Sequence, residues 1–469
     1  MALRGIPSVA VPLCCRAPAV HTRTSGTSPA SFWWCLAQPR AFASTVQAGL
    51  PAFAPGDGRT AFANESTPRL LMAGALLLLC RFRPLVEVGT RAAQWAATPQ
   101  AGILGVPLLW AVRRTAFRHF CGGESLEECI DAASHLAASR VRCIVDWSIE
   151  EDEDEASWDV NAQRKVEVLH KASAALGHNA AFVPIKLTAL LSPSLLERIT
   201  RAEQDAPGPD AALGDPSAGL SADDARLVEE ALARLAKICE AARDCGVPVL
   251  FDAEQSARQL AVHLLARQLQ RRFNIGGAVV VYDTLQMYLQ SSPRRLQGTL
   301  EAARVGGYTF AVKLVRGAYV EQEQPLGTVH PSKEATDAAY DAAATQLLET
   351  VAFGRSTSAS VPAAAVLLAT HNRVSLERSV AEMDRLGIAR DDSLVHFGQI
   401  LGMVDNLSNA LGVAGYNATK LVVFGDMREV LPWLMRRVQE NRDAFGAQAS
   451  ELPVLHAELR RRLRPGSGS

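Results

Sequence analysis

From about residue 140 to the C-terminus, short apolar runs rich in β-branched residues alternate with longer segments of helical period. This alternation predicts a parallel sheet whose strands are joined by crossover helices. The runs are Val141–Trp147, Phe182–Leu190, Pro248–Ala253, Ala278–Tyr282, Thr309–Val315, Ala365–Thr370, Leu394–Gly398 and Ala418–Phe424. Eight strand-helix units in about 300 residues favour an α/β fold of the (β/α)8 TIM-like barrel type. A doubly wound open sheet is the alternative.

The segments before this alternation have a different character. Residues 57–139 show helical period, so we expect an N-terminal helical arm ahead of a barrel spanning residues 140–464. Residues 1–56 contain four arginines but no lysine, aspartate or glutamate. This composition is typical of organellar transit peptides. We therefore expect a mitochondrial protein; a chloroplast location and a merely disordered leader are the alternatives.

The overall composition excludes several other classes. The 48 basic residues balance 49 acidic ones, so no net positive charge favours nucleic-acid binding. The nine cysteines form no C-x-x-C pair, which argues against a zinc knuckle, and their odd number argues against a disulfide framework. G-x-G-x-x-G, Walker, H-E-x-x-H and G-x-S-x-G motifs are all missing from the sequence. No metal site is expected.

The longest apolar run, Leu70–Cys80, has eleven residues and arginines on both sides. A membrane-spanning helix needs roughly 20 apolar residues, so this run is too short to span a bilayer. It is either the apolar part of a helix packed on the domain or part of a contact with a membrane surface.

Polar residues occur at the ends of the predicted strands, where the active sites of such barrels are built. They are Lys186, Asp252, Lys313, Arg316, Tyr319, His371 and Gln399. The last helix adds Arg436 and Arg437, and a guanidinium pair is suited to bind a carboxylate or a phosphate. The sequence thus predicts a positively charged mouth for an anionic substrate or an anionic cofactor, and spacing alone does not choose between them.

Six ordered segments carry a resemblance to a known family. They are Ile185–Ala189, Phe251–Ser256, Val312–Tyr319, Ala369–Asn372, Phe397–Met403 and Leu434–Asn441. With Asp146–Glu151 as a first-strand motif, the chain resembles the proline dehydrogenase (proline oxidase) family in its mitochondrial form. The resemblance implies noncovalent FAD and oxidation of L-proline to Δ1-pyrroline-5-carboxylate by hydride transfer to flavin N5. It further implies electron transfer to quinone and peripheral contact with the matrix side of the mitochondrial inner membrane.

The resemblance also implies roles for individual residues. Lys186, Arg436 and Arg437 would hold the substrate carboxylate, Tyr319 would close over the ring, and Glu440 would orient the arginines. Asp252 and Lys313 would be catalytic residues beside the substrate and the flavin. The implied FAD contacts are Ala253, Gln286, Lys313, Arg316, Gly317, Ala318, Thr370 and His371.

One position departs from the family pattern. Leu421 stands four residues before Gly425, where proline-specific members of the family have tyrosine and hydroxyproline-preferring relatives have serine. Leucine neither fills the space of tyrosine nor offers a partner to a ring hydroxyl. We therefore expect a relaxed or shifted preference that includes trans-4-hydroxy-L-proline. Two other interpretations stay open: a flavin-free lyase using Lys186 or Lys313 as a Schiff-base nucleophile, and an inactive binding protein.

Overall fold

The computed structural model describes residues 50–148, 154–205, 215–357, 363–443 and 448–464. Eight parallel strands close into a barrel in sequence order, and the last strand pairs with the first. This confirms the predicted barrel and excludes the open sheet. The strands are β1 (Arg142–Trp147), β2 (Ala180–Ile185), β3 (Val249–Phe251), β4 (Val281–Gln286), β5 (Phe310–Val315), β6 (Ala364–Ala369), β7 (Val395–Ile400) and β8 (Ala418–Phe424).

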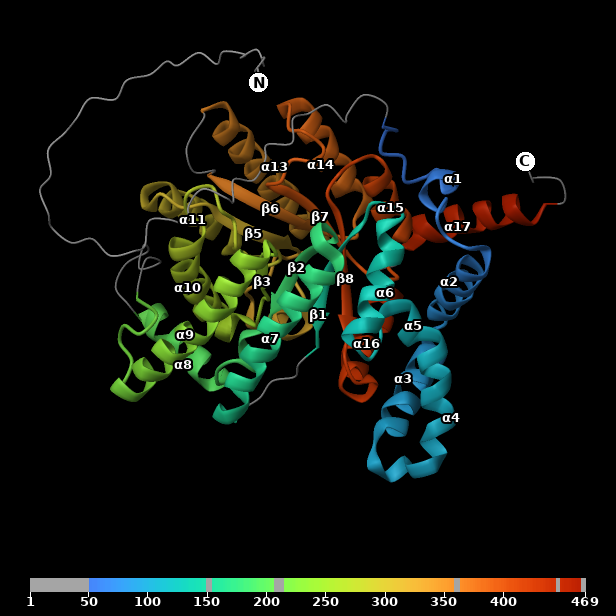
Figure 1. Cartoon of the computed structure of the whole chain (residues 1–469), viewed down its shortest axis with the longest axis horizontal. Coiled ribbons are helices and arrows are strands. Elements are labelled where there is room, and N and C mark those ends of the chain that lie inside the picture. Colours follow the sequence, from blue (N-terminus) through green and yellow to red (C-terminus); the bar gives the residue numbers. More distant parts are fainter. Residues whose placement is uncertain (1–49, 149–153, 206–214, 358–362, 444–447, 465–469) are drawn as a thin grey trace, which may run out of the picture. The chain divides into compact units, whose positions relative to one another are not determined.

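Helices cover the outside of the barrel (Figure 1). In α9, for example, the side chains of Ala231, Leu235 and Ile238 are buried at spacings of three and four, which place them on one face of the helix. The covering helices are α7 (Glu155–Leu176), α8 (Pro193–Asp205), α9 (Ala222–Cys245), α10 (Ser256–Phe273), α11 (Ser292–Gly306), α13 (Lys333–Ser356), α14 (Arg373–Leu386), α15 (Asp405–Val413) and α16 (Met427–Asp443). The short α12 (Val320–Glu323) follows β5.

An aromatic layer fills the barrel interior. Phe182 packs edge to face against Tyr282 and against His396, with ring centroids 5.1 Å apart in both pairs. Burial lowers the pKa of His396 to about 3, so this imidazole stays neutral. The interior is therefore a packed core, and polar chemistry is left to the mouth.

The chain before β1 is helical, which confirms the predicted arm. Its helices are α1 (Gly58–Ala61), α2 (Thr67–Cys80), α3 (Arg83–Ala97), α4 (Gly102–Val112), α5 (Arg118–Phe120) and α6 (Leu126–Ala137). The apolar run forms α2, where Leu70 and Leu77 are buried against the C-terminal helix α17 (Gln448–Leu463) while Leu71 and Leu79 are exposed. Among the described residues, no helix is long and apolar enough to cross a membrane.

Two predicted strands differ most from their bounds in the structure. The second ends at Ile185 and not at Leu190, because Leu187–Ala189 turn into a 3-10 helix. The fourth runs to Gln286 and not only to Tyr282, because hydrogen bonds satisfy the polar side chains that interrupt its apolar pattern. The domain boundaries and the transit peptide remain predictions, and residues 1–49 lie outside the described part of the chain.

Candidate active site

The parallel barrel brings most of the predicted site residues to one end. Lys186 directly follows β2, Asp252 follows β3, and Gln286 is the last residue of β4. Arg316 follows β5, and Thr370 and His371 follow β6. Because the carboxyl ends of parallel strands all point to the same rim, these side chains surround one mouth.

An ion pair lies across this mouth. The Lys313 Nζ donates a hydrogen bond of 2.5 Å to Oδ1 of Asp252, and both side chains are partly buried. At the end of β1, burial raises the pKa of Asp146 to about 6. The charges of Lys165, Asp252, Lys313 and Lys186, in decreasing order, also act on that carboxyl group, so these groups share one electrostatic environment.

A buried amide network supports the strand ends. The side-chain amide of Gln286 donates to the Glu254 carbonyl oxygen at 2.8 Å, and Gln259 accepts the Glu254 N–H at 2.7 Å. The Ala318 N–H donates to Gln286 Oε1 at 3.4 Å, so the network joins the ends of β3, β4 and β5. Glu254 and Gln259 were not predicted as supporting residues, because their role depends on a contact between the loop after β3 and α10 that the sequence does not show.

Arg316 is held on several sides. Its guanidinium group donates to Thr370 Oγ1 at 2.6 Å, to Ser375 Oγ at 2.8 Å and to Asp337 Oδ1 at 2.5 Å. It also lies over the ring of Tyr340. The positive charge is therefore fixed in position, and Asp337 neutralises part of it.

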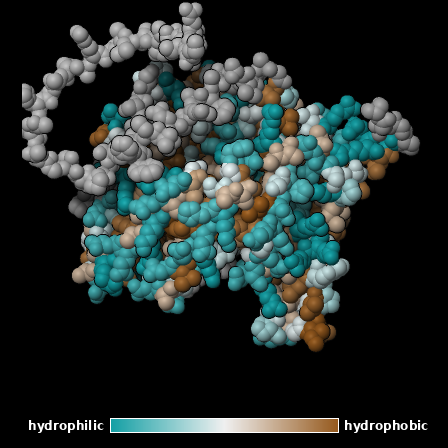
Figure 2. Space-filling view, viewed as in Figure 1, coloured by the Kyte–Doolittle hydropathy of each residue, from teal (hydrophilic) through white to brown (hydrophobic). Residues whose placement is uncertain are grey.

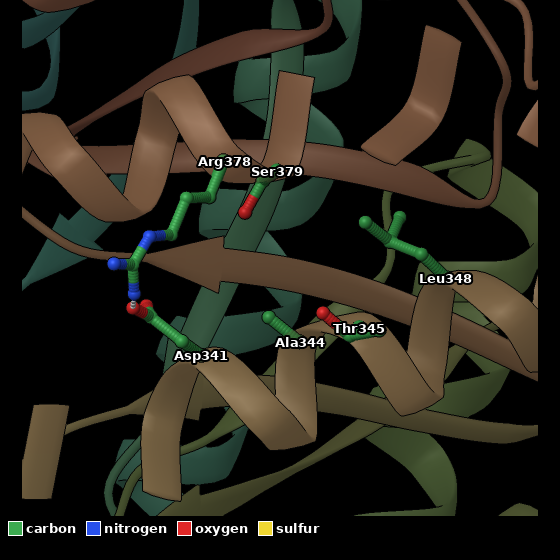
Figure 3. A pocket seen from close by; sticks show the side chains of 6 residues that line it. All are labelled: Asp341, Ala344, Thr345, Leu348, Arg378 and Ser379. Carbon is green, nitrogen blue, oxygen red and sulfur yellow. Dashed lines mark hydrogen bonds and ion pairs between the residues drawn. The ribbon is translucent and has the colours of Figure 1, made fainter. Parts of the chain in front are cut away.

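The support of Arg316 continues to the outside of the barrel. Ser375 donates to Asp341, which also pairs with Arg378, and the two side chains point toward one another in Figure 3. They border a small depression between α13 and α14, lined by Asp341, Ala344, Thr345, Leu348, Arg378 and Ser379. This depression lies in the helical layer, so it belongs to the scaffold and not to the mouth.

Gly317 and Tyr319 fix the loop after β5. Gly317 has a φ of +147°, and a Cβ at this position would lie 1.5 Å from the ring of Tyr288. Only glycine fits there. The Tyr319 hydroxyl donates to the carbonyl oxygen of Ala253 at 3.2 Å, which ties this loop to the end of β3.

The end of β6 is fixed by two contacts to β7. The Nε2 of His371 accepts the backbone N–H of Ile400 at 3.1 Å, so this nitrogen carries no proton and the ring is neutral. The Gln399 amide donates to the Thr370 carbonyl at 3.2 Å. His371 therefore contributes a polar, uncharged group to the mouth.

Strand β8 places Leu421 toward the barrel interior. Its neighbour Lys420 is buried and donates to the carbonyl oxygens of Ile400 and Met403, and it pairs with Asp405 at the start of α15. Lys420 thus points out of the barrel, and successive strand residues alternate sides. Leu421 is consequently an inward residue, and it is only partly buried.

The predicted arginine pair lies on α16, which follows β8. Arg436 is exposed. The backbone of Arg437 and Glu440 continues the same helix, but their side chains lie outside the described residues. The closure of the carboxylate clamp therefore stays a prediction.

A parallel (β/α)8 barrel whose mouth combines lysines, a fixed arginine, a carboxylate and a neutral histidine is the framework of a barrel enzyme for anionic ligands. Comparison with known sequences gives the family. Residues 129–449 match the model of the family described as proline dehydrogenase. The chain belongs to the proline dehydrogenase family.

Individual relatives agree with this assignment. The chain is 32% identical to the hydroxyproline dehydrogenase of Bos taurus over 435 residues, which cover 86% of this chain and 92% of that protein. It is 28% identical over 437 residues to "Proline dehydrogenase 1, mitochondrial" of Arabidopsis thaliana, covering 86% and 85%. Relatives named proline dehydrogenase and relatives named hydroxyproline dehydrogenase thus match this chain at similar sequence identity.

Solved structures support the fold. Proline utilization A (PutA) from Bdellovibrio bacteriovorus, inactivated by N-propargylglycine, matches with a TM-score of 0.63 and 17% identity. The match covers 87% of this chain and 44% of that chain, so this chain spans less than half the length of PutA. At this identity the likeness concerns the barrel fold alone.

Proposed function

We propose that this protein is an FAD-dependent dehydrogenase that oxidises L-proline to Δ1-pyrroline-5-carboxylate. Membership of the proline dehydrogenase family supports oxidation of a cyclic amino acid. The observation that carries the proposal is the mouth in which Asp252 and Lys313 form a close pair beside Lys186. A cyclic amino acid brings one carboxylate to this mouth. Its ring must lie beside fixed charges, which control the protonation of the ring amine.

The residues present fit a flavin dinucleotide. This cofactor is anionic, and the mouth supplies the positive charges of Lys186, Lys313 and Arg316. Gly317 lets the ring of Tyr288 pack directly on the backbone, which fixes the loop after β5 that carries several of the proposed contacts. Ala253, Gln286, Lys313, Arg316, Gly317, Ala318, Thr370 and His371 would hold the group. Bound there, the flavin would supply the electron-accepting chemistry.

The protein's own contribution is orientation and charge. In the proposal, Lys186, Arg436 and Arg437 bind the substrate carboxylate, and Glu440 orients the arginines. Tyr319, tied to Ala253, covers the ring. The positive mouth disfavours the ring ammonium, so the substrate amine is deprotonated more easily and reacts in its neutral form. Holding the ring carbon beside nitrogen in a single orientation is worth a large part of the rate acceleration.

A second substrate is favoured by Leu421. This residue faces the interior of the barrel from β8 and leaves a polar ring substituent without a partner but also without a bulky obstacle. Four of the relatives are named hydroxyproline dehydrogenases, at 31% or 32% identity. The alternative function is therefore the oxidation of trans-4-hydroxy-L-proline at the same site.

The proposed setting is the mitochondrion, with a quinone as the electron acceptor. Relatives from Arabidopsis thaliana and Drosophila melanogaster carry mitochondrial names. The Arg-rich, acid-free composition of residues 1–56 supports an organellar transit peptide. Import can be measured with a fusion of this leader to a reporter protein.

The test of the reaction is the visible spectrum of the purified protein lacking residues 1–56. It is recorded before and after anaerobic addition of L-proline and, separately, of trans-4-hydroxy-L-proline. A flavin spectrum bleached by proline supports the main proposal, and bleaching chiefly by hydroxyproline supports the alternative. Folded protein that binds no flavin would overturn both. Borohydride trapping with a carbonyl substrate would separate the lysine Schiff-base lyase from these readings.

A further inference from the structure

The arm contains a helical hairpin whose surface is unusual. Helices α3 and α4 pack on each other, and α3 also packs on α16 (Figure 1). At the tip, a Cβ on Gly105 would lie 2.5 Å from the Ala96 carbonyl oxygen, so glycine permits the close approach of the two helices. The hairpin is thus a packed unit and not a loose extension.

The hairpin exposes apolar side chains in place of polar ones. In α4, the exposed fractions are 88% for Ile103, 78% for Leu104 and 61% for Trp110. Figure 2 shows hydrophobic residues gathered where this hairpin projects. A helix that is apolar all round is normally buried, because its exposure to water is unfavourable. These side chains therefore need a cover.

Helix α3 adds a second apolar stripe. Val86, Thr90 and Ala93 face the protein and are buried. Leu85, Val88 and Trp95 follow a different face at helical spacing and are exposed by 51%, 64% and 48%. Since the buried face already accounts for packing on the protein, this second stripe serves another contact.

The charges around the hairpin are separated from its apolar part. Residues 92–112 contain no Asp, Glu, Lys or Arg. Residues 66–120 contain seven arginines and a single acid, Glu87, although the whole chain has a formal charge of −1. The arginines flank the apolar segment: Arg91 precedes it and Arg114 follows it, while Arg113 forms ion pairs with Glu124 and Glu128. Arg114 lies over the ring of Trp110.

We propose that the α3–α4 hairpin is a docking surface for an anionic lipid bilayer, into whose interface Ile103, Leu104 and Trp110 insert. Apolar residues with arginines on both sides in the sequence match the boundary between acyl chains and anionic headgroups. A second copy of this chain fits less well, because it would bring two groups of arginines together. The family resemblance implies peripheral membrane contact in general, and the new inference is that this hairpin makes the contact, which goes beyond the proposed reaction.

The first test measures lipid binding by sedimentation of the full chain with vesicles. Wild-type protein is expected to sediment with vesicles of phosphatidylglycerol and phosphatidylcholine, and less with phosphatidylcholine alone. The double variant Ile103→Glu/Leu104→Glu should lower the partition coefficient at least about tenfold, since two apolar side chains lose their burial. Arg91→Gln should lower binding to the anionic vesicles by about fivefold. Both apolar side chains are exposed, so the fold should survive.

The matched control places the same charges elsewhere. Val305 in α11 and Phe353 in α13 are exposed by 73% and 66%, and Val305→Glu/Phe353→Glu should sediment like the wild type. Reduction of bound flavin by proline in solution should be unchanged in every variant, so loss of lipid binding and failure of the proposed reaction are distinguishable.

Two results would overturn the inference. One is equal sedimentation of wild type and Ile103→Glu/Leu104→Glu at matched lipid concentrations. The other is a lipid-free dimer, seen by light scattering, that Ile103→Glu/Leu104→Glu dissociates, because a second copy would then cover the hairpin.

Discussion

The barrel mouth and the α3–α4 hairpin depart from the ordinary distribution of polar and apolar groups in opposite directions. The mouth gathers charged groups such as Lys313 and Asp252 at the edge of an apolar interior. The hairpin presents Ile103 and Leu104 to solvent on the outside. In the mouth, hydrogen bonds and ion pairs orient the polar groups, whereas the aliphatic side chains of Ile103 and Leu104 can form no directional contact of this kind.

The difference teaches what each region is built to receive. Fixed hydrogen bonds orient side chains before a ligand arrives, which is the requirement of a site that acts on one small molecule. An apolar surface without directional contacts tolerates many arrangements of its partner, which suits a fluid interface. If this contrast is correct, the function of the mouth should depend closely on its geometry.

The largest effect is expected from Gly317→Ala. The new Cβ would meet the ring of Tyr288, so the loop after β5 must move and the cofactor contacts proposed there should be lost. The affinity for flavin should fall by about a hundredfold or more, a penalty of roughly 3 kcal/mol, and the purified variant should contain little flavin. Gly298→Ala in α11 is the control, because no atom lies near its added Cβ. A variant Gly317→Ala with normal flavin content would refute the role of this glycine.

The next largest effect concerns the ion pair in the mouth. Asp252→Asn and Lys313→Met should each lower kcat/KM for proline by about a hundredfold, because each leaves a partly buried charge without its partner. The double variant should be far from additive, since both changes remove the same contact. Steady-state kinetics of the four proteins form the cycle, and full additivity would show that the two groups act independently.

A smaller effect is expected at Leu421. Leu421→Ser offers a hydroxyl to the ring substituent and should shift the ratio of kcat/KM for hydroxyproline over proline upward by about tenfold. Leu421→Tyr should shift it downward by a similar factor through loss of space. Competition assays with both substrates measure the ratio directly. If both variants shifted this ratio in the same direction, position 421 would not be involved in recognising the ring substituent.

The smallest effect lies at a buried charge outside the mouth. Glu451 on α17 accepts the Asp405 N–H at 2.8 Å, and burial raises its pKa to about 8. The unfolded chain ionises near the ordinary value of 4.5. Stability contributed by the protonated carboxyl is therefore present below that pH and lost as pH rises toward 8.

Glu451→Gln should remove this dependence and stabilise the protein at pH 8 by about 2 kcal/mol, while changing little at pH 5. Thermal melts between pH 5 and pH 8 give the comparison, with exposed Glu349→Gln as the control. Unchanged activity at pH 8 would show that a buried charge alone does not make a catalytic group, which sharpens the contrast with the mouth.

Much of the fold was predictable because the apolar runs and the helical period are local signals. All eight strands and the helical arm follow from them. The fourth strand was placed too early, since Asp283 and Gln286 interrupt its apolar pattern. Asp283 pairs with His263 on α10, a contact between residues distant in sequence that no local pattern reveals.

The site was predictable to a lesser extent. Polar residues at strand ends identified Lys186, Asp252 and Lys313, because the topology decides where they meet. The supporting network could not be found, since Gln259 acquires its role only through its position beside Glu254. The hairpin was not foreseen either; only the preceding run Leu70–Cys80 was considered as a membrane contact, and an apolar helix reads as core until its exposure is known.

The alternation of side chains along β8 has an evolutionary consequence. Lys420 anchors the strand to the surrounding helices through Asp405, and the next residue, Leu421, faces the interior. Mutation at position 421 therefore leaves the anchor intact. A lineage can exchange leucine, serine or tyrosine there and accept new substrates while the barrel keeps its stability. In this fold, substrate specificity can therefore evolve without loss of the structure.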